Sequence, residues 1–342
     1  MCTCIHYNNR FFGRNLDLEC SYGETLVVAP RTFDFKIPQT HNSAVKYKKT
    51  YAVMGVAHVD EEKNYPLFYD AMNEAGLAMA GLNFPGNAVY FKPGSNNGSA
   101  SYSNGQIDGH LDGNAKVEVA PFQLIPYILH NCSDIKEAKA LLSNLRIVDI
   151  DYNENYKATP LHWMIADENR TIVVEQMAEG LFVYDNPLGV MTNNPPFPYH
   201  MMNMKTYIGM STKTPTAHFA DGLNFEAISN GMGAIGLPGD FSSMSRFIKA
   251  AFVLHNSTPL KANSIESSVS QFMHILSSVA MPRGSVEIKD SVLEYTVYSS
   301  CYDLVSGKFY VKTYDNWTIR TYGFAEADLA CEDGKLTVLD NV

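Results

Sequence analysis

The residues best suited to chemistry stand at the start of the chain, where Met1 is followed by Cys2. A small second residue permits removal of the initiator methionine, which would leave Cys2 with a free α-amine beside its thiol. An α-amine titrates near ~7.7–8.0 and a free thiol near ~8.5, so at neutral pH the amine can take the proton of its own nucleophile. The pair predicts an N-terminal nucleophile that needs no histidine base. The alternative is a partly ordered terminal residue without a catalytic role.

Two charged residues follow at a distance that would return them to Cys2. A strand over residues 2–6, a short turn and an antiparallel return would bring Arg14 and Asp17 beside the thiol. A cation there favours the thiolate, and a carboxylate can hold the amine. An ordinary surface ion pair between the two is the alternative interpretation.

The elements that must position these residues come in runs of one type. Apolar and β-branched stretches bounded by Gly, Pro, Asn or Asp predict strands over residues 25–28, 51–59, 77–82, 161–166, 171–176 and 181–184. A further pair is predicted over 295–304 and 308–314, joined as a hairpin across Ser306-Gly307.

Helices are expected in two blocks. The first spans 122–145, where Asp134 followed by Glu137 has the spacing of a capping box and indicates a second helix start. The second block spans 245–255 and 264–279, with Asn263 and Glu266 as the expected cap of its later helix. Runs of strands and runs of helices favour an α+β layered architecture over a doubly wound parallel sheet.

Composition excludes several classes of function. The 342 residues are 46% hydrophobic, and 26 basic against 36 acidic residues give a net charge of −10, which disfavours nucleic acid and anionic membranes as partners. No apolar run reaches the ~18 residues of a transmembrane helix. Charged residues occupy the stretch where a secretory leader would be apolar, so a cytoplasmic protein is expected. The six cysteines show no metal-binding or disulfide spacing.

Residues 93–114 form a separate feature. They are mostly Gly, Ser and Asn without hydrophobic period, which predicts a flexible surface loop. Asp108 and Asp112 could suggest calcium, but they lack the alternating ligand spacing of an EF-hand. No metal site is expected there.

Several separated motifs, in order along nearly the whole chain, resemble the choloylglycine hydrolase family, which comprises bile salt hydrolases and penicillin V acylases. The motifs are Met1-Cys2-Thr3, Gly13-Arg14-Asn15-Leu16-Asp17, Gly81-Leu82-Asn83-Phe84-Pro85-Gly86, Pro160-Leu161-His162-Trp163, Thr192-Asn193-Asn194-Pro195 and Gly236-Leu237-Pro238-Gly239-Asp240 leading into Ser245-Arg246-Phe247.

The resemblance implies a single N-terminal nucleophile hydrolase domain over residues 1–342, folded as a four-layer αββα sandwich with two antiparallel sheets between helix layers. It implies Cys2 as the nucleophile and its α-amine as the proton shuttle, with no cofactor. The remaining catalytic residues that it implies are Arg14, Asp17 and Arg246 around the thiol, and the Asn193 side chain and the Asn83 backbone N–H as oxyanion donors.

The resemblance also suggests a substrate. The asparagine at position 83 resembles the residue that bile salt hydrolases have at this place, whereas penicillin V acylases more typically carry Tyr there. Conjugated bile salts are therefore the expected substrate. Pocket residues implied in the same way are Leu16, Tyr65, Ile150 and Tyr152. Residues 199–236 resemble the family's assembly extension, which implies a homotetramer.

Three alternatives remain open. The substrate could be penicillin V or another N-acyl amide, since the catalytic residues would be the same. Cys2, Cys4 and His6 alternate along one strand face and could bind a soft metal. The protein could also bind bile acids without turnover.

Overall fold

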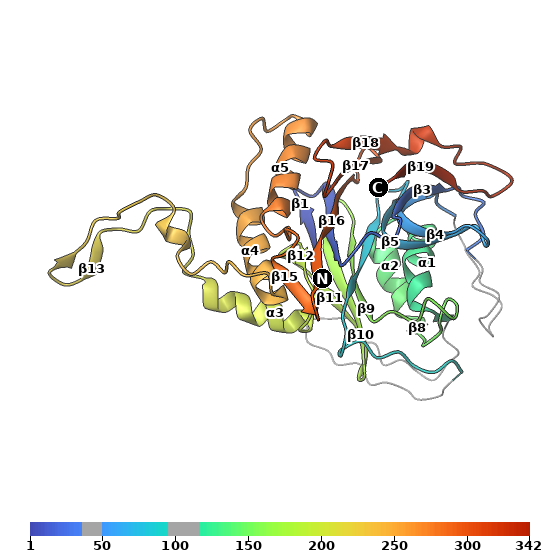
Figure 1. The fold of residues 1–342 in the computed structure, drawn as a ribbon, viewed down its shortest axis with the longest axis horizontal. Helices are drawn as coiled ribbons and strands as arrows, with labels where there is room; N and C mark the ends of the chain where they lie inside the picture. The colour runs from blue at the N-terminus through green and yellow to red at the C-terminus, as the bar shows by residue number, and fades with distance from the viewer. Residues whose placement is uncertain (36–49, 95–116) are drawn as a thin grey trace.

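Two antiparallel sheets lie face to face between two layers of helices (Figure 1). The computed structural model describes residues 1–35, 50–94 and 117–342. The predicted αββα sandwich is therefore confirmed. Of the segment predicted as a surface loop, most lies outside the described residues.

The first sheet carries both chain segments that flank the thiol. Its strand order is β12 (Val190–Met191), β1 (Cys2–Tyr7), β2 (Phe11–Leu18), β16 (Val292–Asp303), β17 (Lys308–Thr313) and β18 (Arg320–Gly323), with β15 (Val286–Lys289) paired to β16. Asn8 and Asn9 make the turn between β1 and β2 at φ values of 53° and 50°. Cys2 thus begins a strand with a neighbour on each side.

The second sheet stacks on the first. Its order is β11 (Gly180–Asp185), β10 (Thr171–Met177), β9 (Leu161–Ala166), β6 (Ala78–Asn83), β5 (Tyr65–Asn73), β4 (Val53–Asp60), β3 (Thr25–Ala29) and β19 (Thr337–Asn341). Consecutive strands pair mostly as hairpins, but β9 lies beside β6, so the end of β6 and the start of β9 meet at one edge. A small parallel pair joins β7 (Val117–Val119) to β8 (Leu145–Ile147).

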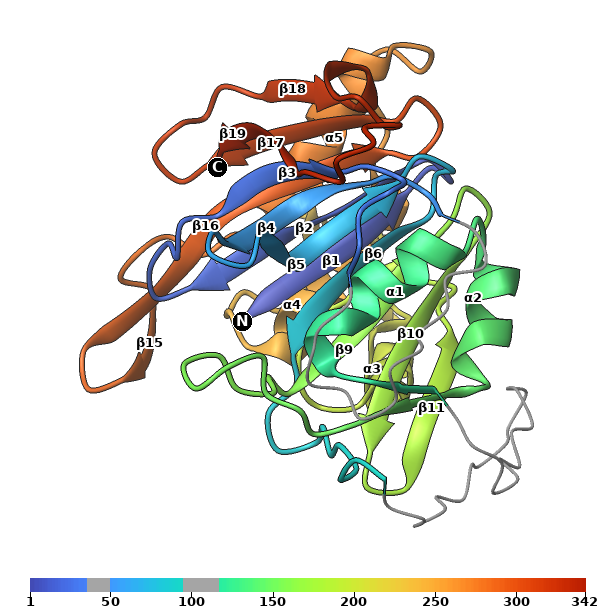
Figure 2. The same cartoon turned by 90° about the vertical axis from the view of Figure 1, so that its right-hand side faces the viewer.

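Helices cover the outer face of each sheet (Figure 2). On the second sheet lie α1 (Leu124–Asn131) and α2 (Ile135–Leu142), which fill one hydrophobic core with the strands beneath them. On the first sheet lie α4 (Ser243–Asn256) and α5 (Ile265–Ser277), which share a second core with both sheets. The short 3-10 turns are η1 (Pro121–Gln123), η2 (Lys205–Tyr207), η3 (Met232–Ala234) and η4 (Phe324–Glu326). Within the described residues, no helix is long and apolar enough to cross a membrane.

The helix starts test the capping predictions. Asp134 caps α2, and its carboxylate accepts from the backbone N–H of Glu137 at 2.8 Å, as predicted. The predicted cap of α5 is wrong by one residue, because Ser264 rather than Asn263 accepts from the N–H of Ser267. A serine hydroxyl one position later satisfies the same free backbone donor.

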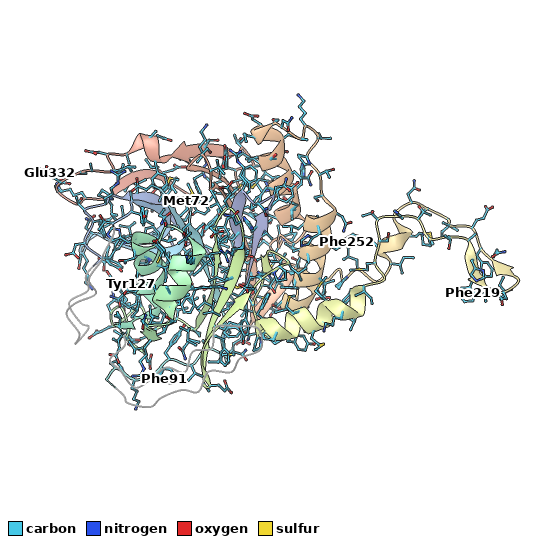
Figure 3. All side chains as sticks on the ribbon, turned by 180° about the vertical axis from the view of Figure 1, so that it is seen from behind. Met72, Phe91, Tyr127, Phe219, Phe252 and Glu332 are labelled. Atoms are coloured by element: carbon cyan, nitrogen blue, oxygen red, sulfur yellow. The ribbon has the colours of Figure 1, made fainter. Side chains whose placement is uncertain are left out.

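A long arm projects from the body between α3 (Phe197–Met204) and α4 (Figures 1 and 3). The hairpin of β13 (His218–Ala220) and β14 (Leu223–Asn224) lies near its tip, where Figure 3 labels Phe219. The arm exposes many large apolar side chains, among them Ile208, Phe219, Phe225, Ile228 and Ile235. Such a density of exposed apolar residues is typical of an interaction surface.

Candidate active site

Strand register brings the two predicted neighbours back to the thiol. In the β1/β2 pair Cys2 lies opposite Leu16 and Cys4 opposite Arg14. Gly13 is required where β2 pairs with β16, because a Cβ at this position would lie 2.0 Å from the carbonyl oxygen of Ser300 on β16. The glycine therefore lets β2 lie close to β16 while the following residue turns toward the second sheet.

Arg14 is a cation buried between the two sheets. Its Nη1 donates to the carbonyl oxygens of Gly81 at 2.5 Å and Tyr69 at 3.1 Å, both on the second sheet. Burial alone would lower the pKa of Arg14, but the nearby Cys2, Tyr298 and Asp70 raise it above its usual value. The guanidinium thus stays charged and supplies a positive field at the thiol.

Asp17 is buried on the same strand. Its Oδ1 accepts from the Thr296 hydroxyl at 2.5 Å, while its Oδ2 has no hydrogen-bond partner among the residues that the structure describes. Burial raises the pKa of Asp17, against the opposing charges of Arg246 and the N-terminal ammonium. An unpartnered buried carboxylate oxygen at this position could hold an amine.

Met1 lies directly before β1. Its ammonium group donates to the carbonyl oxygen of Asp17 at 2.9 Å and forms an ion pair with the buried Glu294. Burial lowers the pKa of this ammonium, while Cys2 and Asp17 oppose the shift. The terminal amine is therefore partly buried and lies close to the carboxylate of Glu294 and the carbonyl of Asp17.

Asn193 and Arg246 converge on the backbone of Cys2. The Cys2 N–H donates to Asn193 Oδ1 at 2.8 Å, and Arg246 Nη2 donates to the same oxygen at 2.8 Å. Arg246 Nη1 also donates to the Cys2 carbonyl and to the Thr3 hydroxyl, each at 2.6 Å. Three segments that lie far apart in the sequence are thereby fixed around one residue.

Asn83 completes the group at the end of β6. The Asn193 Nδ2 donates to the Asn83 carbonyl oxygen at 2.8 Å, so one amide proton of Asn193 is used there and the second is left for another acceptor. Cys2, Arg14, Asp17, Asn83, Asn193 and Arg246, the six residues implied as catalytic, lie in this one connected region.

A cavity of about 400 Å³ opens beside the thiol. Cys2, Arg14 and Asn83 lie in its lining, and most of the remaining wall is apolar, formed by Leu16, Leu18, Leu67, Phe68, Phe122, Ile125 and Leu161. Of the four residues implied as pocket contacts, Leu16 and Tyr152 line this cavity, whereas Tyr65 and Ile150 do not. The ring of Tyr65 stacks behind Tyr152 at 5.5 Å.

A linked group of polar residues lines part of the same cavity, and no pattern in the sequence indicates it. Glu19, Tyr22, His58 and Tyr156 are lining residues. The Tyr22 hydroxyl donates to Glu19, and His58 lies 3.0 Å from the Tyr22 carbonyl oxygen and 2.8 Å from the Tyr156 hydroxyl. The cavity is therefore amphipathic.

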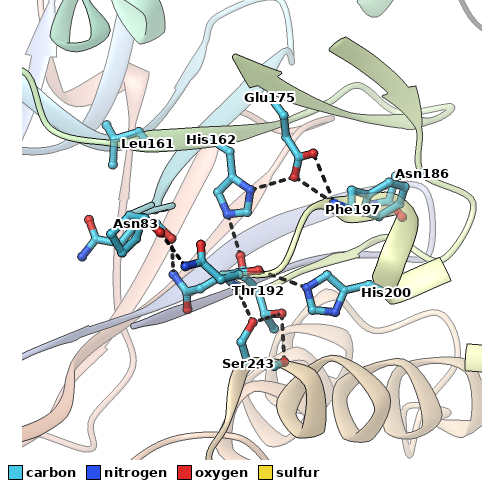
Figure 4. Close-up of polar contacts among 12 residues, drawn as sticks. Asn83, Leu161, His162, Glu175, Asn186, Thr192, Phe197, His200 and Ser243 are labelled. Carbon is cyan, nitrogen blue, oxygen red and sulfur yellow. Dashed lines mark hydrogen bonds and ion pairs between the residues drawn. The ribbon is translucent and has the colours of Figure 1, made fainter. Parts of the chain in front are cut away.

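The loop that carries Asn193 is itself held by two buried histidines and a half-buried serine (Figure 4). Ser243 accepts from the Asn193 N–H at 2.9 Å, His200 Nε2 donates to the Asn193 carbonyl at 3.0 Å, and His162 Nε2 donates to the Thr192 carbonyl at 2.8 Å. Sequence reasoning missed these supporting residues, since they come from β9, α3 and α4 and have no common spacing.

The metal alternative depends on Cys2, Cys4 and His6, which are all buried in β1. In the described part of the chain, no group of three His, Cys, Asp or Glu side chains is placed to hold a metal ion.

A buried cysteine at the start of a central strand of an αββα sandwich defines the class as that of the N-terminal nucleophile hydrolase fold. A sequence profile of the linear amide C-N hydrolases, choloylglycine hydrolase family, matches residues 2–337. The chain belongs to this family and is a linear amide C-N hydrolase.

Similar proteins agree with this assignment. The chain is 42% identical over 323 residues to a bile salt hydrolase/transferase of Lactiplantibacillus plantarum, covering 94% of this chain and 91% of the relative. It is 38% identical over 322 residues to one of Clostridium perfringens, covering 92% and 90%. A crystal structure of the C2A mutant of conjugated bile acid hydrolase from Clostridium perfringens aligns with a TM-score of 0.85 at 33% identity, covering 99% and 97% of the two chains.

A solved structure from outside the bile acid hydrolases also shares the fold. Penicillin V acylase from Agrobacterium tumefaciens aligns with a TM-score of 0.72 at 18% identity, covering 99% of this chain and 91% of the other.

Proposed function

We propose that this enzyme hydrolyses the amide bond of glycine- or taurine-conjugated bile salts, with Cys2 as the nucleophile and an acyl-thioester intermediate. The observation that carries the proposal is the position of Cys2, which lies in the wall of the amphipathic cavity while its backbone nitrogen is held by Asn193. The relatives named as bile salt hydrolases support the substrate class.

The reaction would begin once Met1 has been removed. The nitrogen that donates to Asn193 Oδ1 is then a free amine on the same residue as the thiol. The unpartnered Oδ2 of Asp17 is a second acceptor for this amine, and the charged Arg14 lines the cavity together with Cys2. These contacts hold the base and nucleophile together.

In the first half of the reaction the amine takes the thiol proton and the sulfur attacks the substrate carbonyl carbon. The carbonyl oxygen becomes an oxyanion, for which the second Nδ2 proton of Asn193 and the Asn83 N–H are the proposed donors. The ammonium then gives its proton to the leaving nitrogen as the C–N bond breaks, which releases glycine or taurine. In the second half water adds to the thioester, the bile acid leaves, and the thiol regains a proton.

Arg246 would act on the geometry of the site rather than on protons. It donates to the Cys2 carbonyl and to Asn193 Oδ1, so it fixes the nucleophile and the oxyanion donor relative to each other. Because Oδ1 already accepts from two groups, the Nδ2 side of the amide must face the other way. This orientation is the one that oxyanion stabilisation requires.

The cavity fits the acyl part of a conjugated bile salt. Its apolar wall suits the steroid body, and Glu19, Tyr22, His58 and Tyr156 offer partners for hydroxyl groups on an otherwise apolar ligand. Sites for small molecules typically combine an apolar lining with a few polar groups in this way. A linear acyl chain would offer these polar residues no hydroxyl group to bind.

The arm is proposed as an assembly surface for other copies of the same chain, which gives the homotetramer that the family resemblance implies. Its apolar side chains, such as Ile208, Phe219 and Ile228, are exposed in the single chain, and burying them in a partner would remove that apolar area from water. Light scattering of the wild type and of the Phe219→Ser/Ile228→Ser variant would test this proposal, since the variant should dissociate.

Product analysis tests the proposed reaction directly. Glycocholate, taurocholate and penicillin V are offered side by side to the wild type and to Cys2→Ser, and the products are identified by mass spectrometry. Free glycine or taurine with cholate from the wild type alone is the expected result. Bile-salt binding without these products would show a binding protein, and cleavage of penicillin V alone would show the other substrate class.

A further inference from the structure

His162 touches both segments that carry the proposed oxyanion donors. Its Nε2 lies 2.8 Å from the carbonyl oxygen of Thr192, the residue before Asn193. Its ring stacks on Phe84, the residue after Asn83, with the centroids 4.3 Å apart and the planes 6° from parallel. The side chain is buried on β9, at the strand edge where β6 ends (Figure 4).

Both ring nitrogens of His162 face hydrogen-bond acceptors. The Thr192 carbonyl can only accept, so Nε2 must carry a proton. Nδ1 lies 3.1 Å from Oε1 of Glu175, which also accepts from the Phe197 backbone N–H at 3.0 Å. A carboxylate oxygen that accepts a backbone N–H is an acceptor toward the ring as well. A ring with a proton on each nitrogen beside an ionised Glu175 would satisfy both contacts.

The surrounding charges come from several elements. Tyr184 on β11 interacts electrostatically with Glu175, and His200 on α3 interacts with His162 and with Arg246 on α4. Burial lowers the pKa of His200 to about 4, against its hydrogen bond to Asn193, and the neighbouring His162 and Arg246 lower it further. His200 is thus neutral. Its Nε2 donates to the carbonyl of Asn193, the residue after Thr192, whose carbonyl accepts from His162.

We propose that His162, held by Glu175 with a proton on both ring nitrogens, is a positioning residue that fixes the Asn83 and Asn193 segments relative to each other and so sets the oxyanion donors. The inference rests on the proposed function for the role of those donors. His162 itself does not line the cavity, so it acts on substrate only through its neighbours.

A double-mutant cycle separates positioning from a general structural role. The variants His162→Gln, Asn193→Ala and the double variant are compared for kcat and KM on glycocholate. Residues that orient metal ligands typically change activity 10- to 100-fold when replaced, and by analogy His162→Gln should lower kcat by about tenfold or more with KM nearly unchanged. In the Asn193→Ala background the His162→Gln change should lower kcat by less than about a further threefold, because one of the two donors whose relative position His162 fixes is already absent.

His130→Gln is the matched control, since His130 is also buried and bonded to a backbone carbonyl, that of Tyr51, but lies on α1 away from the site. Its kcat should equal that of the wild type. The inference would be overturned if the fall in kcat of the double variant equalled the product of the two single falls. It would also be overturned if kcat of His162→Gln lay within twofold of the wild type. Asn193→Ala alone tests the proposed function, so the two failures can be told apart.

The protonation state gives a test that does not depend on the variants folding. Nuclear magnetic resonance of the ¹⁵N-labelled wild type at pH 7 should show His162 with a proton on both ring nitrogens. In Glu175→Gln the side-chain amide can donate to Nδ1, so that nitrogen should lose its proton while Nε2 keeps the bond to Thr192. An unprotonated Nδ1 in the wild type would refute the role given to Glu175.

Discussion

Replacing Asn193 with alanine should slow the chemical step far more than it weakens substrate binding. The amide Oδ1 accepts from Cys2 and Arg246, and Nδ2 donates to the Asn83 carbonyl with one proton left over. Loss of one oxyanion donor costs about 2.7–4 kcal/mol in the transition state, which corresponds to a fall in kcat of about 10²- to 10³-fold. Stability should fall as well, by about 1–3 kcal/mol, because two buried donors lose their acceptor.

Asn194→Ala is the matched control for this change. The neighbouring amide is of the same type but donates to the Pro85 carbonyl at 2.6 Å, and it makes no contact with the Cys2 backbone. Initial rates over a range of glycocholate concentrations, with urea melts in parallel, give kcat, KM and stability for both variants. A proportional rise in KM with kcat retained in Asn193→Ala, or equal losses in both variants, would refute the assignment of Asn193 as a transition-state donor.

Three further predictions follow from the same contacts. Cys2→Ser should abolish turnover while Cys4→Ser keeps it, because burial raises the pKa of Cys4 and leaves that thiol protonated; equal losses in the two rates would favour the metal alternative. Asn83→Tyr should shift kcat/KM from bile salts toward penicillin V, and an unchanged ratio would remove this residue as the basis for choosing bile salts. Burial lowers the pKa of His6 to about 4 in the folded protein. As the pH falls from 6.5 to 4, His6 therefore takes up a proton in the unfolded chain but not in the folded one, and the free energy of unfolding decreases. His6→Phe should therefore reduce the loss between pH 7 and pH 5 by about 2 kcal/mol in urea melts, and an unchanged loss would contradict the assigned state of His6.

Local patterns were sufficient to predict the strands and caps that depend on neighbouring residues. The β1/β2 hairpin that returns Arg14 and Asp17 to the thiol follows from two short strands and a turn, and the Asp134 cap follows from its spacing to Glu137. The strand β5 was not predicted, because its mixture of Pro, Asp and aromatic residues has no clear alternation. Its fit depends on pairing with both β4 and β6.

The rest of the site depends on contacts between distant segments. Nothing local in the sequence shows that Asn83, Asn193 and Arg246 meet at Cys2, and only the family resemblance indicated it. The His162–Glu175 pair joins the consecutive strands β9 and β10, but the contacts of His162 with Phe84 and Thr192 depend on the pairing of β9 with β6 and on the distant Thr192 loop, which no local spacing reveals. The lining of the cavity also depends on segments that are distant in the sequence. Leu16 and Tyr152 line the cavity, whereas Tyr65 stacks against Tyr152 and is not part of the lining.

Trapping the intermediate tests the central proposal most directly. Wild-type enzyme is mixed with glycocholate, quenched in acid within the first turnover, and digested for mass spectrometry. The N-terminal peptide should begin at Cys2 and carry one cholyl group as a thioester on that residue. An active enzyme that retains Met1, or rapid glycine release with no acyl group on Cys2 at any quench time, would contradict the proposed mechanism.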